Sequence, residues 1–326
     1  MKEGKLSVGL AGIGGIGMVH YSNWAQIQSA EVKALVGNSA ADQQHAKAWQ
    51  LPLYNSISAM CQQEDIDLVD ICTPTFTHKQ MTLESLGCRK HTIVEKPIAL
   101  NLSDAQDMFA AADQNGVQLY VAQVVQFTRE TAALRKTVRE MTYGQPLDAV
   151  FERLSAYPHW SRDSWMMDRS KSGLLPFDLH IHDLDLIVSL FGIPYSMSCT
   201  SAGAEDKDYR EQYRFLYGYD GLTVCAEAAW FNAAIPFTAR WRVYFERGIL
   251  ICDQNGVNGY ESDGRLTTFD VSDDIQISTG INLAPTAMFY HELSHFSDCA
   301  RAGIPSPLVP RGQVLGVLTV LDRLGF

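Results

Sequence analysis

Short apolar runs alternate with amphipathic stretches over the first 123 residues of the chain. Runs of this length, separated by segments long enough for a helix, predict parallel strands in a sheet that is covered on both faces. We expect strands at 5–11, 32–36, 68–72, 92–94 and 119–125, and helices at 16–29, 41–49, 77–86 and 103–115. The predicted fold class of this part is α/β, a doubly wound parallel sheet.

The pattern changes after about residue 124, where longer alternating runs are joined by turn residues such as Tyr219-Asp220-Gly221. Such spacing predicts hairpins and a mostly antiparallel sheet. We expect strands at 147–157, 214–217, 222–231, 238–245 and 249–253, and helices near 174–190, 287–302 and 313–324. The chain is therefore predicted to have two domains, residues 1–123 and residues 124–326, the second of class α+β.

Composition excludes several classes of function. The chain has 26 Lys and Arg against 37 Asp and Glu, a formal net charge of −11, so it lacks the overall basic surface that nucleic acid or an anionic membrane requires. Seven cysteines, an odd number without a Cys-x-x-Cys pair, argue against a disulfide framework and against a zinc knuckle. We therefore expect a reduced, cytoplasmic protein with no metal cofactor.

The apolar stretch Leu6–Val19 follows Lys2 and Lys5 and superficially resembles a signal peptide. Its glycines are spaced for a turn rather than for a membrane-embedded helix, and no apolar run of about 18 residues occurs elsewhere. We expect neither a signal peptide nor a transmembrane helix.

The same stretch contains Gly12-Ile13-Gly14-Gly15-Ile16-Gly17, between the first predicted strand and the first predicted helix. Glycines at 12, 14 and 17 permit a tight turn, close approach of a pyrophosphate and close packing of helix on strand. The free N–H groups and the dipole of the helix favour the phosphates. The motif predicts dinucleotide binding by Gly12, Gly14, Gly15, Ile16 and Gly17; a purely structural glycine turn is the alternative.

The choice between NAD and NADP depends on the end of the second strand, where an acidic residue usually binds the ribose 2′-hydroxyl of NAD. Here the chain reads Val36-Gly37-Asn38-Ser39, without a carboxylate. Asn38 and Ser39 have hydrogen-bond donors for a 2′-phosphate, although no arginine is adjacent. The sequence is compatible with both NAD and NADP and slightly favours NADP.

Two further segments follow predicted parallel strands and therefore fall on the ligand-binding edge of the sheet. One is Thr73-Pro74, and the other is Glu95-Lys96-Pro97. Because a proline biases the preceding residue toward an extended backbone, we expect the Lys96 side chain to point into the crevice at this edge.

The segment Ser172–Asp185 contains several histidines and aspartates that can act in acid–base catalysis or bind a metal. If Phe177–Leu190 is helical, Asp178, His182 and Asp185 share one face, where carboxylates can orient a histidine as a base. A buried polar patch under the sheet is the alternative. A further alternative is a metal-dependent hydrolase in which His180 and His182 bind the metal. Side chains two residues apart on a helix point about 200° away from each other, so one metal ion would not easily bind both histidines.

Taken together, these motifs resemble those of the glucose–fructose oxidoreductase, inositol dehydrogenase and MocA family. The likeness rests on Gly12-x-Gly14-x-x-Gly17, Thr73-Pro74, Glu95-Lys96-Pro97 and Asp178-x-x-x-His182, in order, over nearly the whole chain. It implies a Rossmann domain followed by an open, mostly antiparallel sheet, which commonly forms homodimers or homotetramers. Two departures are His180, where many members have glycine, and Gln126, where many have arginine.

The resemblance implies an NAD(P)-dependent dehydrogenase acting on CH–OH groups of a sugar, inositol or related polyol. By the same likeness Lys96, Asp178 and His182 are the catalytic residues. The expected cofactor-binding residues are the glycine turn with Asn38, Ser39, Thr73, Pro74, His78, Glu95, Lys96 and Pro97. The expected substrate-binding residues are Lys96, Gln126, Trp165, Asp178 and His182.

Aromatic residues before Asp178, namely Tyr157, His159, Trp160 and Trp165, are candidates to line a sugar pocket or to pack in a core. A catalytically silent regulatory protein that binds sugar and dinucleotide is the alternative to an enzyme, because a fold can be kept while its function changes.

Overall fold

The computed structural model of the chain describes residues 4–158, 162–205, 207–281 and 283–326. Two compact units divide it: Met1–Phe127 with Asp273–Arg311, and Thr128–Ser272 with Gly312–Phe326. The expected boundary after residue 123 lies close to the first crossing between these units. Residues 273–311, however, pack with the first unit, although the sequence assigned them to the second.

The first unit contains a six-stranded parallel sheet in the order β3-β2-β1-β4-β5-β6. Its strands are β1 (Leu6–Ala11), β2 (Ala30–Val36), β3 (Leu53–Tyr54), β4 (Leu68–Ile71), β5 (His91–Glu95) and β6 (Leu119–Ala122). This is the strand order of the Rossmann fold, with the order reversing between β1 and β4. The doubly wound sheet predicted from the sequence is confirmed. The two-residue strand β3 was not expected.

The helices of the first unit are α1 (Gly15–Trp24), α2 (Ala40–Trp49), α3 (Ile57–Gln63), α4 (His78–Gly87), α5 (Leu102–Asn115) and α9 (Met288–Ala302). Helix α5 begins at Leu102, one residue before the expected start at 103, and the Asn101 side chain caps it by accepting a hydrogen bond from the Asp104 N–H. It ends at Gly116, in the left-handed conformation that favours glycine.

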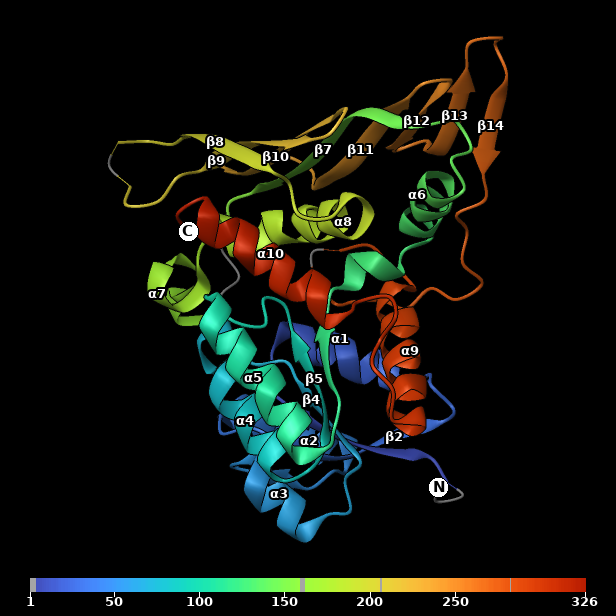
Figure 1. Cartoon of the computed structure of the whole chain (residues 1–326). Coiled ribbons are helices and arrows are strands. Elements are labelled where there is room, and N and C mark those ends of the chain that lie inside the picture. Colours follow the sequence, from blue (N-terminus) through green and yellow to red (C-terminus); the bar gives the residue numbers. More distant parts are fainter. Residues whose placement is uncertain (1–3, 159–161, 206, 282) are drawn as a thin grey trace. The chain divides into compact units, whose positions relative to one another are not determined.

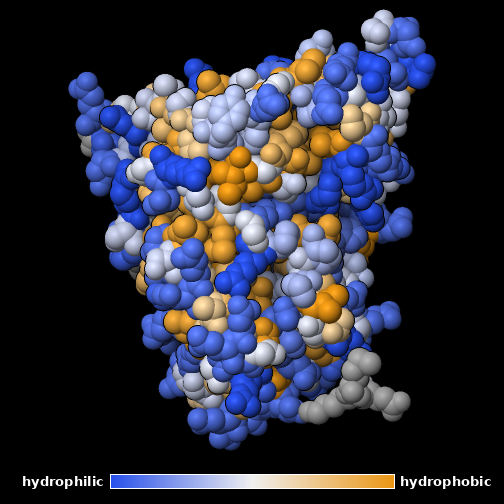
Figure 2. Space-filling model, viewed as in Figure 1, coloured by the Kyte–Doolittle hydropathy of each residue, from blue (hydrophilic) through white to orange (hydrophobic). Residues whose placement is uncertain are grey.

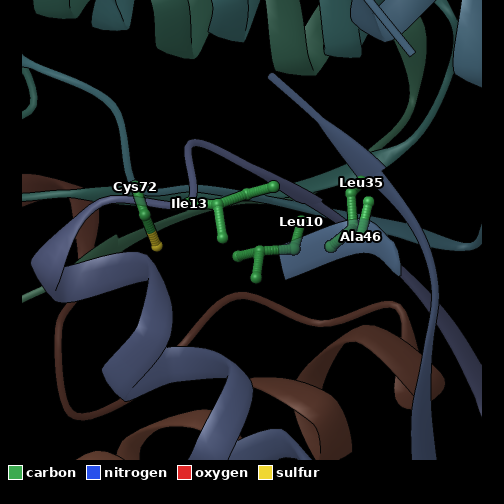
Figure 3. Close-up of a cluster of buried hydrophobic side chains, with 5 residues drawn as sticks. All are labelled: Leu10, Ile13, Leu35, Ala46 and Cys72. Atoms are coloured by element: carbon green, nitrogen blue, oxygen red, sulfur yellow. The ribbon is translucent and has the colours of Figure 1, made fainter. Parts of the chain in front are cut away.

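A hydrophobic cluster fixes the start of the glycine-rich turn in the first unit. Leu10, Ile13, Leu35, Ala46 and Cys72 are buried together, and Figure 3 shows that they come from β1, the turn, β2, α2 and the end of β4. Ile13 is 4% exposed, so the turn itself contributes an apolar side chain to the core. This packing holds the backbone of the turn against the ends of two strands.

Helix α9 joins the first unit through contacts with α1 and with the 3₁₀ turn Val124–Phe127. Val19, Val124 and Phe289 form one buried cluster there. Further along, the Tyr120 hydroxyl donates to the Ile304 carbonyl at 2.8 Å. Such contacts between residues far apart in sequence explain why residues 273–311 could not be placed from local pattern.

The second unit contains an eight-stranded sheet in the order β14-β13-β12-β11-β7-β10-β9-β8. Its strands are β7 (Pro146–Ala156), β8 (Ser196–Ala202), β9 (Gln212–Tyr219), β10 (Leu222–Phe231), β11 (Thr238–Phe245), β12 (Gly248–Asp253), β13 (Gly256–Glu261) and β14 (Leu266–Phe269). Only the β7–β10 pair is parallel. The mostly antiparallel sheet is thus confirmed, and three of its strands, β8, β13 and β14, were not expected.

One face of this sheet carries helices. They are α6 (Arg129–Arg139), α8 (Ile181–Phe191) and α10 (Arg311–Arg323), with the short α7 (Arg169–Ser172) nearby. Figure 1 shows α8 and α10 below the sheet, and Val188 of α8 lies close to Gly316 of α10. The opposite face presents alternate side chains of each strand.

Among the described residues, no helix is long and apolar enough to span a membrane. Figure 2 shows hydrophobic residues interspersed with hydrophilic ones on the side of the molecule in view. All seven cysteines are unpaired.

Candidate functional site

The glycine-rich turn joins β1 to α1 at the carboxyl edge of the parallel sheet. Gly12 has a φ of +87°, and a Cβ there would lie 2.7 Å from Thr73 Cγ2 and 2.8 Å from the Cys72 carbonyl oxygen. A Cβ on Gly17 would overlap the Gly12 carbonyl oxygen. These two glycines are therefore required by the fold of the turn itself.

Gly14 differs from both, because nothing lies within 4 Å of a Cβ built on it. It is the N-cap of α1, it has an extended backbone, and no side chain caps the helix there. The first turn of α1 has no acidic residue either. Open space beside uncapped N–H groups at a helix N-terminus fits a pyrophosphate. Gly14, Gly15 and Ile16 would hold it.

Substitution of Gly14 separates binding from folding. Gly14→Val is expected to keep the melting temperature of the protein while weakening NADH binding at least about tenfold, because the side chain fills space that the structure leaves open. Fluorescence titration with NADH and thermal unfolding measure the two effects. Gly17→Ala is the matched control and should lower the melting temperature. Full NADH affinity in the folded Gly14→Val protein would contradict this assignment.

A carboxylate lies at the end of β2, although none of the residues 36–39 is acidic: it belongs to Asp42. Ser39 caps α2, and Asp42 completes a capping box in which the two residues bond to each other's backbone N–H. Asp42 Oδ2 accepts hydrogen bonds from Ser39 N at 2.8 Å and from Asn38 N at 3.0 Å. The signal in the sequence is the spacing Ser39-x-x-Asp42, which lies beyond the residues that directly follow the strand.

Two loops at the same edge are connected by His78. Its Nδ1 lies 2.8 Å from the Pro97 carbonyl oxygen, and its Nε2 lies 2.8 Å from the Thr73 carbonyl oxygen. His78 is 1% exposed, and burial lowers the pKa of its imidazole. The His78 ring thus holds the Thr73-Pro74 loop against the Lys96-Pro97 loop, and its expected part in cofactor binding stays a prediction.

Glu95 is the last residue of β5, and Lys96 follows it at this edge. Lys96 is partly exposed, and its backbone N–H donates to the Glu95 carboxylate, Oε2, at 2.9 Å. Glu95 itself is 7% exposed. The Glu95 side chain therefore supports the backbone that carries Lys96, and it is not itself open to a ligand to the extent that Lys96 is.

Behind Glu95 lies a buried polar cluster that the sequence analysis missed. His20 of α1 is fully buried, with Nδ1 2.9 Å from Asp70 Oδ2 and Nε2 3.0 Å from Glu95 Oε1. The Trp24 indole N–H also donates to Asp70 at 2.7 Å. The signal in the sequence was a histidine one turn after the last glycine, together with a charged residue inside the apolar run of β4.

The charge of this cluster follows from its geometry. Burial lowers the pKa of the His20 imidazole, but the charges and hydrogen bonds of Asp70 and Cys72 together raise it more, so this pKa lies well above its ordinary value of 6.5. Cys72 is beside it, and burial raises the pKa of its thiol. Among described residues, only His20, Asp70 and Cys72 place three metal-ligating atoms within 4.8 Å of one another. Their mutual hydrogen bonds account for this proximity without a metal.

Gln126 lies in the 3₁₀ turn Val124–Phe127 and is 2% exposed. Its backbone N–H donates to the Gln123 carbonyl at 2.9 Å. A buried position of this kind does not by itself favour the substrate contact that was expected of Gln126.

The second unit carries Asp178 and His182 at the start of α8. Residues Pro176–His180 form a π-helical turn rather than the first turn of a continuous α-helix. Asp178 and His182 are both partly exposed, whereas the three residues between them are buried. Single π-helical turns are frequent at functional sites because they change which side chains a helix presents.

His180 and Asp183 fix this turn to the sheet. His180 Nε2 lies 2.7 Å from the Tyr217 hydroxyl, and its ring stacks on Phe215 at 3.7 Å between centroids. Burial, together with the charge of Arg153, lowers the pKa of His180 to about 3, so it is neutral at pH 7. Asp183 is bound by Arg153 through two hydrogen bonds of 2.7 and 3.1 Å. A hydrolytic metal site on His180 and His182 therefore has no support in this arrangement.

Asp185 does not share the partial exposure of Asp178 and His182. It is 1% exposed and accepts a hydrogen bond from Gln313 Nε2 at 2.8 Å. Asp185 follows His182 by three residues within the regular helix α8, so its packing against Gln313, and not the helix period, separates it from the two partly exposed residues.

The aromatic candidates have different surroundings. Trp165 lies in the 3₁₀ turn Arg162–Met167 and is half-buried. The Tyr157 ring lies 6.0 Å from the Tyr209 ring. His159 and Trp160 lie outside the described residues.

Parts of this chain are similar in sequence to known enzymes. The chain is 30% identical over 138 residues to a 2,7-anhydro-N-acetylneuraminate hydratase of Escherichia coli, covering 42% of this chain and 37% of the relative. It is 26% identical over 191 residues to a myo-inositol 2-dehydrogenase of Thermotoga maritima, covering 57% and 55%. The matches thus span less than two thirds of either relative.

Among solved structures, an oxidoreductase from Agrobacterium radiobacter in complex with NAD⁺, L-tartaric acid and magnesium has the same fold. The TM-score is 0.82 at 17% identity, over 98% of this chain and 94% of that one. Residues 6–123 match the model of the oxidoreductase family with an NAD-binding Rossmann fold, and residues 131–251 match the GFO/IDH/MocA C-terminal domain. These two matches cover more than half of the chain, which therefore belongs to the glucose–fructose oxidoreductase, inositol dehydrogenase and MocA family of oxidoreductases.

Proposed function

We propose that this protein is an NAD(P)-dependent oxidoreductase that transfers a hydride between nicotinamide and a secondary alcohol of a sugar, inositol or related polyol. The observation that carries the proposal is the turn at Gly14, where open space adjoins the uncapped N-terminus of α1 at the edge of a parallel sheet. Relatives named as a myo-inositol 2-dehydrogenase and a glucose-6-phosphate 3-dehydrogenase support the substrate class.

The nicotinamide, when bound, supplies the acceptor or donor of the hydride. In alcohol oxidation, His182 takes the hydroxyl proton as general base, and Asp178 orients the reacting hydroxyl by a hydrogen bond. Lys96 of the first unit supplies positive charge to the same reaction, balancing the charge that develops on oxygen. The partial exposure of all three side chains is consistent with contact to a substrate.

Two sets of contacts hold the backbone that carries these proposed catalytic residues in place. Glu95 and His78 hold the loop that carries Lys96, and His180 and Asp183 hold the turn that carries Asp178 and His182. Rigid supporting contacts of this kind keep catalytic side chains in one geometry. Trp165 is proposed to contact the substrate.

The test is turnover by the purified protein with NAD⁺ and NADP⁺ against a panel of sugars and inositols, followed at 340 nm. We expect reduction of the cofactor with at least one polyol, and a rate at least about tenfold lower in the Gly14→Val variant when the cofactor concentration is well below saturation. Binding of dinucleotide and of sugar without turnover in either direction would instead favour the catalytically silent binding protein.

We further propose that the open face of the eight-stranded sheet contacts a second copy of the chain, as expected for a homodimer or homotetramer. The pairing register places Tyr244 and Tyr260 on this face, each opposite Ile249 of β12, and places Leu216 on the same face. Leu216, Tyr244 and Tyr260 are 49%, 47% and 44% exposed, respectively. Exposed large apolar side chains on a face that also carries ion pairs, such as Arg242–Asp148, give the mixed apolar and polar surface that is typical of interfaces.

Charge placed on this face should therefore dissociate the assembly. Leu216→Glu combined with Tyr244→Glu is expected to lower the mass measured by light scattering to that of one chain, because a buried interface cannot accommodate unpaired carboxylates. Ile304→Glu is the control, because Ile304 is 49% exposed but belongs to the first unit and lies outside this sheet. A wild-type protein that has the mass of a single chain at micromolar concentration would contradict the proposal.

A further inference from the structure

The carboxylate of Asp42 lies where the side chain at the end of β2 would normally be. Gly37 directly follows β2, and a Cβ on Gly37 would be 2.7 Å from Asp42 Oδ2 and 2.8 Å from Asp42 Cγ. The glycine thus leaves room for a carboxylate that arrives from the first turn of α2. In the strand order of this sheet, β2 is the direct neighbour of β1.

The glycine-rich turn is tied to this position through the backbone. Gly12 N donates to the Val36 carbonyl oxygen at 2.9 Å, so the turn and the last residue of β2 are adjacent. A dinucleotide on the turn therefore extends past the end of β2 with its adenosine ribose, where an acidic side chain accepts from the ribose hydroxyl in NAD-binding folds.

One carboxylate oxygen of Asp42 accepts hydrogen bonds from the backbone, and the other can accept hydrogen bonds from a ligand. Both hydrogen bonds from the Asn38 and Ser39 N–H groups go to Oδ2. Within the part of the chain that the structure describes, no donor is bound to Oδ1, and the residue is partly exposed. A carboxylate oxygen that is held in place and open to solvent suits a pair of ribose hydroxyls.

The same arrangement opposes a 2′-phosphate. The N–H groups of Asn38 and Ser39, which would be the natural donors for it, already bind Asp42. Among the described residues, no lysine or arginine forms an ion pair with Asp42 that would offset its charge. A phosphate there would meet a like charge and few donors.

We infer that Asp42 selects NAD over NADP by binding the adenosine ribose hydroxyls and repelling a 2′-phosphate. The inference rests on the proposed function, and it reverses the lean to NADP that residues 36–39 suggested. The acid that usually ends the second strand is replaced here by one that reaches the same place from the capping box of the following helix.

The test is the ratio of the dissociation constants for NADPH and NADH, measured by fluorescence titration. We expect wild-type protein to bind NADH at least about tenfold more tightly. Asp42→Asn should reduce the ratio about tenfold or more, the size expected for loss of a charged hydrogen bond. Asp104→Asn is the matched control, because Asp104 occupies the corresponding position of α5 beside its own cap, Asn101, and should leave the ratio unchanged.

A second measurement needs no variant, in case Asp42→Asn does not fold. Adenosine 5′-monophosphate should displace NADH from wild-type protein at least about tenfold more effectively than adenosine 2′,5′-bisphosphate does. Equal or tighter binding of NADPH, or an unchanged ratio in folded Asp42→Asn, would overturn the inference and leave the proposed function intact. Binding of neither cofactor would overturn the proposed function and the inference with it.

Discussion

Replacement of His182 by alanine is expected to lower kcat by about 10²–10⁴-fold, the usual contribution of a positioned general base. NADH affinity should stay within about twofold, because the dinucleotide turn belongs to the first unit and His182 to the second. The expectation rests on the partial exposure of His182 and on the buried residues His180 and Asp183, which hold the turn on either side of it. Steady-state kinetics and fluorescence titration on the same preparation measure both quantities.

A structural role for His182 would also lower activity, so the variant needs a chemical readout. Imidazole added to His182→Ala should restore part of the lost kcat, because a diffusible base can replace a missing proton acceptor but cannot repair a misfolded turn. His291→Ala is the control, since His291 is paired with Asp273 at 2.8 Å and has no role in the proposed reaction. Full kcat in His182→Ala would remove His182 from the mechanism.

Lys96→Met serves as the companion variant in the first unit. It keeps much of the side-chain length and removes the charge, so loss of kcat with unchanged NADH affinity would agree with the proposed role of Lys96. Unchanged kcat would count against placing Lys96 in the substrate crevice.

The fold could be predicted from the sequence wherever local pattern determines it. The apolar runs of β1, β4 and β5 are short and bounded by turn residues, and the glycine turn has its own spacing requirement. Residues 273–311 were misplaced because their packing partners, such as Val19 and Tyr120, lie far away in the sequence. No period within the segment encodes such contacts.

The candidate site was predictable only for residues that belong to a motif. His20 and Asp70 lie outside any motif, because their roles depend on distances between elements. Asp42 belongs to a capping-box pattern, but that pattern predicts the start of a helix and not a ligand contact. Asp185 shows a second limit. The helical period places Asp185 near His182, but Gln313, 128 residues further along the chain, buries it by a hydrogen bond that no local pattern predicts.

The second large effect concerns stability and is expected at His20. His20→Leu should lower the free energy of unfolding by about 3–5 kcal/mol at pH 7, because it leaves Asp70 and Glu95 buried without a compensating cation. Urea unfolding followed by circular dichroism measures the change. The reference is the triple variant His20→Leu, Asp70→Asn, Glu95→Gln, in which no charge remains in the cluster.

Comparison of these variants distinguishes charge from packing. If uncompensated charge causes the loss, the triple variant should be far more stable than His20→Leu, since an uncharged cluster carries no unpaired carboxylate. Equal destabilisation of the two would instead assign the effect to the lost shape of the imidazole. Glu95→Gln also keeps an acceptor for the backbone N–H of Lys96, so the loop that carries Lys96 retains its support.

The pH dependence of wild-type stability provides an independent check. Because the pKa of His20 in the folded protein is raised above its value of 6.5 in the unfolded chain, its contribution is fully present below about pH 6.5. It is lost as the pH rises through the folded-state pKa, when the imidazole between Asp70 and Glu95 gives up its proton. The stability difference between wild type and the triple variant should therefore shrink from pH 6 toward alkaline pH. A difference that grows with pH would mean that His20 is buried in its neutral form, and that the two carboxylates share their charge with another partner.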